Sequence, residues 1–258
     1  MRAFARAWTI AMNTVREAIR SKLLYALLFF AILMILSSVL LSSLSYVERE
    51  RILQDLGLGA IRLFGVAIAI FVGVELIHKE VDRRTVQTIL SKPLTRAEFL
   101  LGKFVGLVIA IWIQMAIMMA VFGAVSLASG APLSATHAAA FLLTGIELAL
   151  VVAIATFFSA FTTPLLASFF SSALWIAGNL TRNLRDIGAA SELEPLRVAT
   201  LWLYRLLPDL DSFNLSIEAT HGLPIAASDI WLAIAYGVAY VAIVLLGAVV
   251  IFERRDFR

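Results

Sequence analysis

The sequence contains no cysteine, so neither disulfide bonds nor thiolate metal sites are available to it. Charged residues are also scarce: they make up 15% of the chain, against about 25% in soluble domains. The three histidines fall in different predicted loops. There is no G-x-x-x-x-G-K-[ST], no H-E-x-x-H and no G-x-S-x-G. The chain therefore lacks the usual signatures of a nucleotide hydrolase, a zinc protease and a serine hydrolase.

Apolar sequence dominates the chain instead. Hydrophobic residues account for 61% of it and the mean hydropathy is +0.94, which is typical of an integral membrane protein. We expect an all-α membrane protein in which residues 1–258 form one transmembrane domain. Six stretches are long enough to cross a bilayer, which takes about 20 apolar residues. They lie near 23–44, 61–77, 104–127, 138–161, 163–180 and 230–251.

Three details concern the ends of these stretches. Arg62 stands at the start of the second, where we expect its guanidinium to reach the membrane surface. Pro164 opens the fifth, where a missing backbone N–H is tolerated. Little more than Phe161 and Thr162 joins the fourth to the fifth, which predicts a tight helical hairpin.

The distribution of basic residues predicts the orientation in the membrane. Of the 21 lysines and arginines, fourteen lie in the first 22 residues, in segment 75–103 and in the last five residues. We therefore expect both termini and the 75–103 loop to be cytoplasmic. The connection at 181–229 is then external, and it is acidic.

Two segments outside the spans have helical patterns. In residues 1–22, apolar side chains recur every three or four positions opposite several arginines, at Phe4, Trp8, Met12, Val15 and Ile19. This favours an interfacial helix over a plain cytosolic extension of the first span. In segment 181–229, we expect a short helix that begins near Glu194-Pro195 and ends before Pro208, and that lies against the outer membrane surface or is partly re-entrant. Asp209 and Asp211 are interpreted as turn residues rather than as a cation site.

Segment 75–103 gathers six basic and four acidic residues between two apolar stretches. A short helix over 77–91 ends before Pro93. Thr95 and Glu98 then form a T-x-x-E capping box that starts the next helix, which continues into the third span. A push on this loop would reach two spans, so we interpret it as a docking element.

Polar residues within the spans are candidate functional groups because burying them is costly. Glu147 is the clearest, either as a substrate contact, proton site or gate, or as a structural partner inside the bundle. For Gln114 and Asn179 interhelical hydrogen bonding is expected, and Gly102-x-x-x-Gly106 permits close helix approach. Glu75, His78 and Glu80 do not share one helical face, which favours a solvated helix end over a metal site.

The 75–103 loop also carries an ordered set of residues: Glu80, Thr85, Leu90, Pro93, Arg96 and Lys103. Their order and spacing resemble the signature of type-2 ABC transporter permeases, the membrane subunits of a class of ATP-binding-cassette exporters. The resemblance extends over the whole chain. It includes the basic amphipathic start, the six spans, an external stretch with Leu207-Pro208-Asp209, and the tail Phe252-Glu253-Arg254-Arg255.

This resemblance implies that the chain forms a dimer, either with a second copy of itself or with a close homologue. It also implies a separate cytoplasmic ATPase, two copies of which bind beneath that dimer. ATP and Mg²⁺ belong to that ATPase, and no cofactor to this chain. Segment 78–98 would be the coupling segment that contacts the ATPase. The protein itself would lie in a bacterial inner membrane. The residues implied in coupling are Glu80, Arg83, Arg84, Thr85, Pro93, Arg96 and Lys103.

The resemblance also places the second and fifth spans around the translocation path, with short re-entrant helices in 181–229 closing the outer gate. Candidate path or gate residues are Phe64, Ile68, Phe71, Glu147, Phe169, Phe170 and Trp175.

The function expected is that of an exporter permease for a hydrophobic or amphipathic substrate. The alternative is ATP-driven transmission of mechanical work to an external accessory protein, as in metal-site maturation, without bulk transport. An intramembrane enzyme built around Glu147 is a weaker third hypothesis, because no nucleophile, base and water path come together. Membrane lipid is an expected partner. Nucleic acid is not, since the basic residues flank apolar spans.

Overall fold

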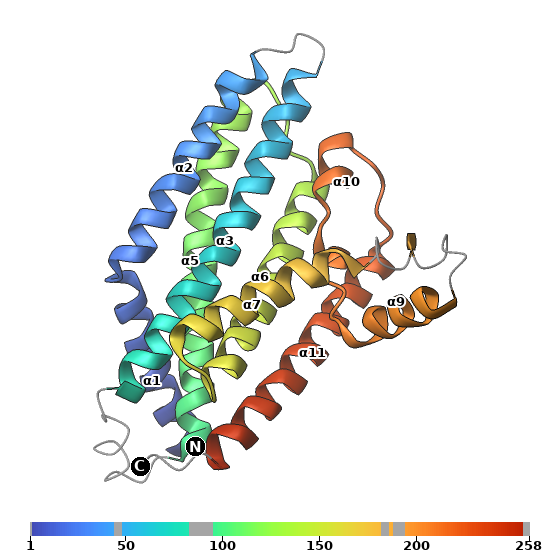
Figure 1. Ribbon diagram of the computed structural model, residues 1–258. Helices are drawn as coiled ribbons and strands as arrows, with labels where there is room; N and C mark the ends of the chain where they lie inside the picture. The colour runs from blue at the N-terminus through green and yellow to red at the C-terminus, as the bar shows by residue number, and fades with distance from the viewer. Residues whose placement is uncertain (1, 44–47, 83–94, 182–185, 188–193, 255–258) are drawn as a thin grey trace.

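The computed structural model describes residues 2–43, 48–82, 95–181, 186–187 and 194–254. Within these ranges the long segments are helical and no strand is present (Figure 1). The helices are α1 (Arg2–Ile19), α2 (Lys22–Ser42), α3 (Arg49–Asp82), α5 (Arg96–Ala128), α6 (Ala135–Ser159), α7 (Pro164–Asn179), α9 (Glu194–Leu206), η1 (Asp211–Phe213), α10 (Ser216–His221) and α11 (Ala227–Arg254). The prediction of an all-helical fold is confirmed.

Five helices are long and apolar enough to cross a membrane: α2, α3, α5, α6 and α11. The predicted fifth of six spans, α7, has 16 residues. At about 1.5 Å per residue it is about 24 Å long, shorter than a hydrocarbon core of about 30 Å. Five of the six predicted spans therefore meet the length that a crossing requires, and α7 does not meet it alone.

The helix α3 is much longer than the predicted span 61–77. It runs from Arg49 to Asp82 without a break, since neither a proline nor a glycine with positive φ interrupts it. Near its first turns, Gln54 Nε2 donates to the carbonyl of Pro132 at 3.1 Å. Part of the helix predicted over 77–91 is thus the last turn of α3, and residues 83–94 lie outside the described ranges.

The start of α5 is where the sequence predicts it. The Thr95 hydroxyl accepts from the Glu98 backbone N–H at 3.2 Å, and the Glu98 carboxylate accepts from the Thr95 N–H at 3.1 Å. This reciprocal arrangement is the predicted capping box. α5 has 33 residues, or about 50 Å, so it extends beyond the hydrocarbon core on at least one side.

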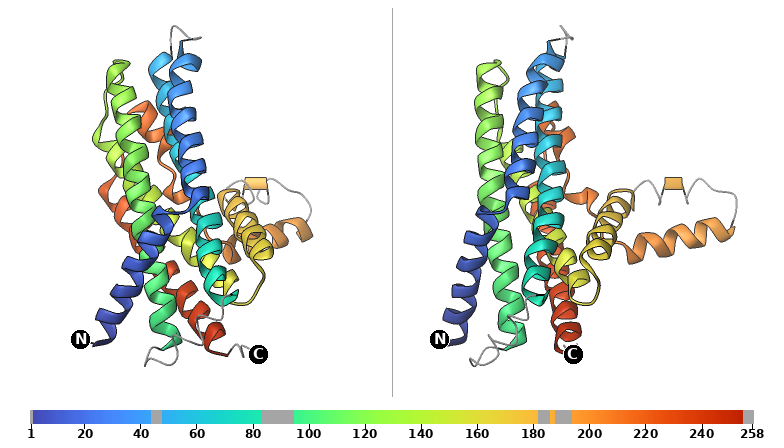
Figure 2. Two further views of the ribbon diagram at one scale, coloured as in Figure 1. Left: turned by 90° about the vertical axis from the view of Figure 1, so that its left-hand side faces the viewer. Right: turned by 60° about the vertical axis from the view of Figure 1, so that its left-hand side comes forward.

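The first half of α5 packs closely against α1, as Figure 2 shows at the N-terminal end of the bundle. A Cβ added at Gly102 would lie 2.8 Å from the carbonyl oxygen of Ala7, and one added at Gly106 would lie 2.5 Å from that of Ala11. Both contacts are closer than real Cβ atoms allow. The predicted close approach at Gly102-x-x-x-Gly106 is therefore confirmed, and its partner is α1.

The face that α1 turns toward α5 is not the predicted apolar one. Ala11, Thr14 and Ala18 are buried, whereas Trp8 and Ile19 are 48% and 41% exposed. Of the apolar residues predicted to share one face of an interfacial helix, Val15 is buried, whereas Trp8 and Ile19 remain open to the surroundings. Close contact with the α5 glycines requires small side chains, so the large apolar ones turn outward, where lipid can contact them.

Helix α6 is enclosed by other helices along much of its length. Every residue from Leu150 to Thr156 is buried, and the helix contacts α3, α5, α7 and α11. A helix that is apolar on all sides is expected at the centre of a bundle. α7 follows after a short connection and packs back on α6, which confirms the predicted hairpin.

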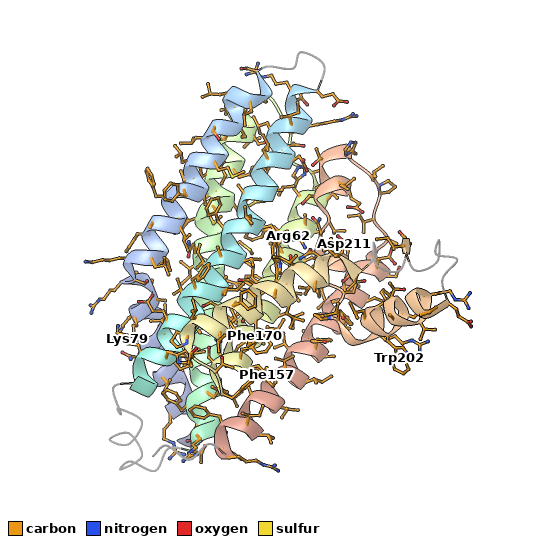
Figure 3. All side chains as sticks on the ribbon, in the orientation of Figure 1. Arg62, Lys79, Phe157, Phe170, Trp202 and Asp211 are labelled. Atoms are coloured by element: carbon orange, nitrogen blue, oxygen red, sulfur yellow. The ribbon has the colours of Figure 1, made fainter. Side chains whose placement is uncertain are left out.

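The chain between α7 and α11 has two parts. α9 begins at Glu194 and ends at Leu206, as predicted, and it projects sideways from the bundle (Figure 2). Trp202 on this helix is 66% exposed (Figure 3). η1 and α10 instead pack on the bundle, where α10 contacts α3 and α6. This second part lies directly beside the polar centre described below.

The contact between α1 and α5 generates the first prediction. Gly106→Ala should lower the free energy of unfolding in detergent, measured by circular dichroism, by about 1–3 kcal/mol, because the new methyl group meets rigid backbone. Gly123→Ala on the same helix is the matched control, since its nearest neighbour atom would be an ordinary 3.5 Å away. Equal stability of the two variants would contradict the packing described.

Candidate functional site

The centre of the bundle contains an ion pair between Arg62 of α3 and Glu147 of α6. Arg62 Nε donates to Glu147 Oε2 at 2.7 Å, and Arg62 Nη2 donates to Glu147 Oε1 at 2.9 Å. This two-point geometry is the one in which a guanidinium binds a carboxylate most strongly. The Glu147 side chain is fully buried, and that of Arg62 is 14% exposed. The pair is therefore largely removed from water (Figure 3).

Two residues of α7 complete the first layer around this pair. Trp175 Nε1 donates to Glu147 Oε1 at 2.9 Å, and Arg62 Nη2 donates to Asn179 Oδ1 at 2.5 Å. Asn179 is held in turn, because its Nδ2 donates to the Trp175 carbonyl at 2.9 Å. Arg62 also donates to the Leu210 carbonyl at 3.3 Å, just before η1. Four segments distant in sequence thus meet at one guanidinium.

This arrangement overturns one expectation and bears on another. Arg62 does not reach toward a membrane surface but turns inward to Glu147. The reason is that a guanidinium without a partner in apolar surroundings is costly, whereas the Glu147 carboxylate supplies the counter-charge. Glu147 Oε1 accepts from Arg62 and Trp175, and Glu147 Oε2 accepts from Arg62. These contacts are what the structural interpretation of Glu147 predicts. Asn179 also bonds between helices, as expected.

Gln114 differs from these residues. Neither its Oε1 nor its Nε2 has a hydrogen-bond partner among the described residues, although the side chain is buried. The expected interhelical hydrogen bond of Gln114 is therefore not seen.

A second polar cluster lies at the other end of α3. Glu17 of α1 accepts from Lys79 of α3 at 3.0 Å and from Lys103 of α5 at 3.3 Å. Lys103 is 1% exposed, so this charge is enclosed by protein. Partial burial of Glu17 opposes its ionisation, but hydrogen bonds and charges from Lys79 and Lys103 outweigh it and hold its pKa below the usual value.

Further contacts hold the beginning of α5. Arg6 of α1 binds Glu98 at 2.7 Å. Arg96 Nη1 donates to the carbonyls of Phe252 and Glu253 at 3.2 and 3.0 Å. The start of α5 is thereby attached to α1 and to the end of α11, so these two elements enclose the point where the 83–94 segment joins the bundle.

The predicted coupling residues divide into two groups. Arg83, Arg84, Thr85 and Pro93 lie outside the described residues, and so does the side chain of Glu80. Arg96 and Lys103 are described, and both bind other helices of the same chain. No structural statement follows for the first group.

The predicted path residues are likewise separated. Trp175 and Glu147 belong to the buried network. Phe71 on α3 and Phe169 on α7 are 44% and 63% exposed, on the outer surfaces of two helices that contact each other. Phe170 is 39% exposed, and Ile68 is buried in the core. The structure therefore brings Glu147 and Trp175 together, whereas the described part of the chain leaves Phe71 and Phe169 exposed.

A cavity of about 340 Å³ reaches the buried network from one side. Its lining includes Asp55, Gly59, Arg62, Leu63 and Trp175. Arg62 and Trp175 are thus the members of the polar centre that line this cavity.

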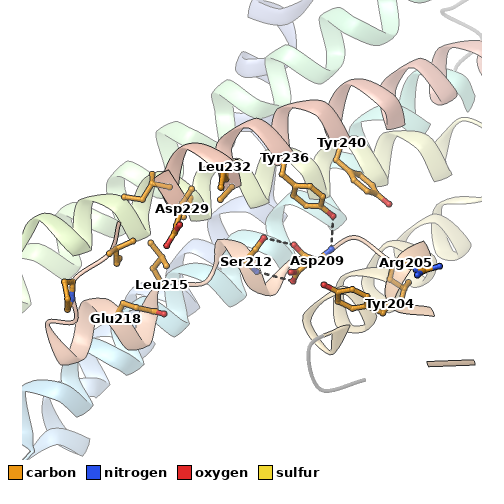
Figure 4. Close-up of a pocket in the computed structure, with 16 residues that line it drawn as sticks. Tyr204, Arg205, Asp209, Ser212, Leu215, Glu218, Asp229, Leu232, Tyr236 and Tyr240 are labelled. Atoms are coloured by element: carbon orange, nitrogen blue, oxygen red, sulfur yellow. Dashed lines mark hydrogen bonds between the residues drawn. The ribbon is translucent and has the colours of Figure 1, made fainter. Parts of the chain in front are cut away.

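A larger pocket, of about 720 Å³, lies between the start of α11 and the segment from α9 to α10. Three tyrosines, Tyr204, Tyr236 and Tyr240, contribute to its wall (Figure 4). Asp209 is fixed within it: its N–H donates to the Tyr236 hydroxyl at 2.9 Å, and its carboxylate accepts from the Ser212 N–H at 3.3 Å. These bonds support the interpretation of Asp209 as a turn residue. Within the described ranges, no three metal-binding side chains gather.

The family profile described as "ABC-2 family transporter protein" matches residues 8–257. The chain belongs to the ABC-2 transporter family. It is thus the membrane permease component of an ABC transporter, a family without an ATPase domain. A search of the curated proteins returns no match.

Sequence reasoning identified most polar residues of this permease singly and missed their partnership. Arg62 and Glu147 are 85 positions apart, so no local pattern links them. One signal was available: Arg62 and Glu147 are an arginine and a carboxylate embedded in predicted spans, and charges within a bundle usually pair.

The ion pair generates the second prediction. Glu147→Gln leaves the Arg62 guanidinium buried without its counter-charge, so the free energy of unfolding in detergent should fall by about 3–5 kcal/mol. The double variant Arg62→Met/Glu147→Leu removes both charges and should recover most of this loss. Gln114→Leu is the control, because it replaces an amide without a partner among the described residues. Additive losses in the double variant would contradict direct pairing.

The Glu17 cluster generates the third prediction. Since the folded state lowers the pKa of Glu17 from its ordinary 4.5, ionised Glu17 stabilises the fold at higher pH. That contribution should disappear as pH falls through the lowered pKa. The stability difference between wild type and Glu17→Gln should accordingly shrink in thermal melts taken from pH 7 down to pH 3. The exposed Glu50→Gln serves as control. A difference that grows toward low pH would refute the assignment.

Proposed function

We propose that this permease is the membrane subunit of an exporter that a separate ATP-binding-cassette ATPase drives. Its substrate is hydrophobic or amphipathic and moves outward across a bacterial inner membrane, with both termini on the cytoplasmic side. The observation that carries the proposal is the continuity of α3. This helix joins the 83–94 segment directly to Arg62, 20 residues from its end at Asp82, or about 30 Å away.

The cytoplasmic ion pairs support the proposed coupling. Lys79 and Lys103 stand on either side of the 83–94 segment, and both bind Glu17. A displacement of that segment by the ATPase would therefore move α1, α3 and α5 together. Arg96 and Lys103 act in this proposal by positioning the segment, because their contacts are within the chain. Direct docking falls to Glu80, Arg83, Arg84, Thr85 and Pro93.

Exposed apolar side chains support a dimer. α3 exposes Leu63 and Phe71, and the adjoining α7 exposes Leu165, Phe169 and Ile176. In the proposed assembly a second permease copy covers this face and the translocation path lies between the copies. Each dimer then binds two ATPase subunits, which hold the ATP and Mg²⁺. The 340 Å³ cavity beside Arg62 contains Leu63 in its lining, so the path would meet the polar centre there.

The proposal also accounts for the short α7. Where α7 ends, the chain returns to it, since the Leu210 N–H donates to the Gly178 carbonyl at 3.1 Å. η1 and α10 follow on the same side of the bundle and pack on α6. We therefore infer that α7 and the chain from Leu210 to η1 together make the fifth of six crossings. α9 and α10 are then the external helices that close the outer gate.

A second candidate function draws on the pocket beside α11. Because Leu210 links Arg62 to η1, motion of α3 would reach the wall of the 720 Å³ pocket, which includes Ser212 and Leu215. This favours transmission of work to an external accessory protein, such as one that matures a metal site, as the alternative to bulk transport. The two differ in whether ATP hydrolysis moves a substrate when no accessory protein is present.

The coupling proposal generates the fourth prediction. Co-expression with the ATPase encoded beside it should yield a complex that copurifies and hydrolyses ATP. Arg83→Glu/Arg84→Glu reverses two charges of the docking segment, so copurification and hydrolysis should fall at least tenfold. Arg49→Glu/Arg51→Glu, at the opposite end of α3, is the matched control and should leave both unchanged. A fully active complex of the docking variant would show that the ATPase docks elsewhere.

A further inference from the structure

The elbow between α1 and α2 encloses a cleft of about 980 Å³. Four cationic residues line it: Arg16, Arg20, Lys22 and Lys79. Its two carboxylates are Glu17 and Glu75. Since Glu17 already binds Lys79 and Lys103, the cleft retains an excess of positive charge.

Three of these cations have no counter-ion among the side chains that the structure describes. Arg16, Arg20 and Lys22 form no ion pair with any described residue of the chain. They lie within seven consecutive positions, and both arginines are exposed. Like charges held this close repel one another unless an anion lies between them. The cleft is therefore suited to an anionic ligand.

The start of α2 adds hydrogen-bond donors to the same cleft. Its N-cap residue, Ser21, has an extended backbone with φ −68° and ψ 124°, and its side chain caps no N–H group. The first turn of α2 contains no acidic residue. The N–H groups of that turn thus have no side-chain acceptor at the helix end that attracts anions. The Ser21 hydroxyl is buried without a hydrogen-bond partner among the described residues, and Ser21 lines the cleft.

Apolar surface continues from this site along the membrane-crossing helix. Leu23 and Leu76 line the cleft, and α2 then exposes Tyr25, Phe29 and Leu33. A ligand with a phosphate at one end and acyl chains at the other matches this sequence of surfaces. A free phosphate ion would use the polar part alone.

We propose that the α1–α2 elbow binds the headgroup phosphate of an anionic phospholipid in the leaflet beside α1. Arg16, Arg20 and Lys22 neutralise the phosphate, and the Ser21 hydroxyl and the α2 N–H groups donate to it. The acyl chains lie along α2. Clusters of basic residues at the edge of a membrane span bind such headgroups. The bound lipid also holds α1 beside Lys79, so it supports the Glu17 cluster.

The test uses the full-length permease purified in detergent, without an ATPase, so that its outcome is independent of the exporter proposal. Native mass spectrometry measures retention of added phosphatidylglycerol against phosphatidylcholine. Wild type should prefer phosphatidylglycerol. Arg16→Gln/Arg20→Gln/Lys22→Gln should weaken its binding on the order of 100-fold, since three charge contacts are lost. Arg49→Gln/Arg51→Gln/Arg197→Gln removes three exposed arginines away from the cleft and should change nothing.

Two further variants separate binding from folding. Arg16→Lys/Arg20→Lys keeps the charge and should retain the lipid, whereas Ser21→Ala should weaken binding severalfold without changing the thermal midpoint. Equal retention of both lipids by wild type, or unchanged binding in the triple glutamine variant, would overturn the proposal. So would displacement of the lipid by millimolar inorganic phosphate, which would assign the cleft to a free anion.

Discussion

A guanidinium and a carboxylate lie inside a membrane bundle only if each has the other within reach, and most of this structure is arranged around that requirement. Burying either Arg62 or Glu147 alone costs several kcal/mol, roughly, because neither charge would have water or a partner. The pair therefore fixes the register of α3 against α6 to within a fraction of a turn. A shift of either helix by one residue in the sequence register would turn its charged side chain about 100° away from the partner helix.

The same requirement explains the neighbouring segments. Glu147 Oε1 accepts from Trp175, and Arg62 Nη2 donates to Asn179. Both residues come from the last two turns of α7, so α7 ends at the level of the ion pair. The chain then returns to place the Leu210 carbonyl against Arg62. The residues that complete the hydrogen bonds of the pair are thus those that connect the bundle to η1 and α10.

Small residues make this close arrangement possible. A Cβ added at Gly65 of α3 would lie 2.8 Å from Leu148 Cδ1, and one at Gly178 of α7 would lie 2.8 Å from the Pro208 carbonyl. Both glycines are within three residues of a member of the polar network. In a membrane, burial of apolar surface does not drive helices together, because lipid tails are equally apolar. Close packing and polar contacts drive their association instead. The Gly65 contact and the ion pair therefore act on the same helix pair, α3 and α6, and Gly178 lets the returning chain approach α7.

The features that could be predicted from the sequence are those that local physics determines. The capping box at Thr95 depends on residues three positions apart, the start of α9 on a proline in the first turn, and the crossing helices on runs of apolar residues. The inward turn of Arg62 depends instead on Glu147, which only the tertiary fold brings near. The outward turn of Trp8 on α1 depends similarly on Gly102 and Gly106, which leave room for small side chains alone.

Helix α3 carries one ion pair near its middle and a second near its C-terminal end. Lys79 binds Glu17 near the end at Asp82, and Arg62 binds Glu147 about 25 Å away along the helix. A helix held only by apolar contacts can slide in small steps, since those contacts exchange at little cost. Directed bonds at two separate points along the helix resist such sliding and favour a few discrete positions. In the proposed exporter, a displacement of the 83–94 segment would therefore reach Arg62 and switch the whole polar network from one arrangement to another. The change would also move the Leu210 carbonyl and the wall of the pocket beside α11.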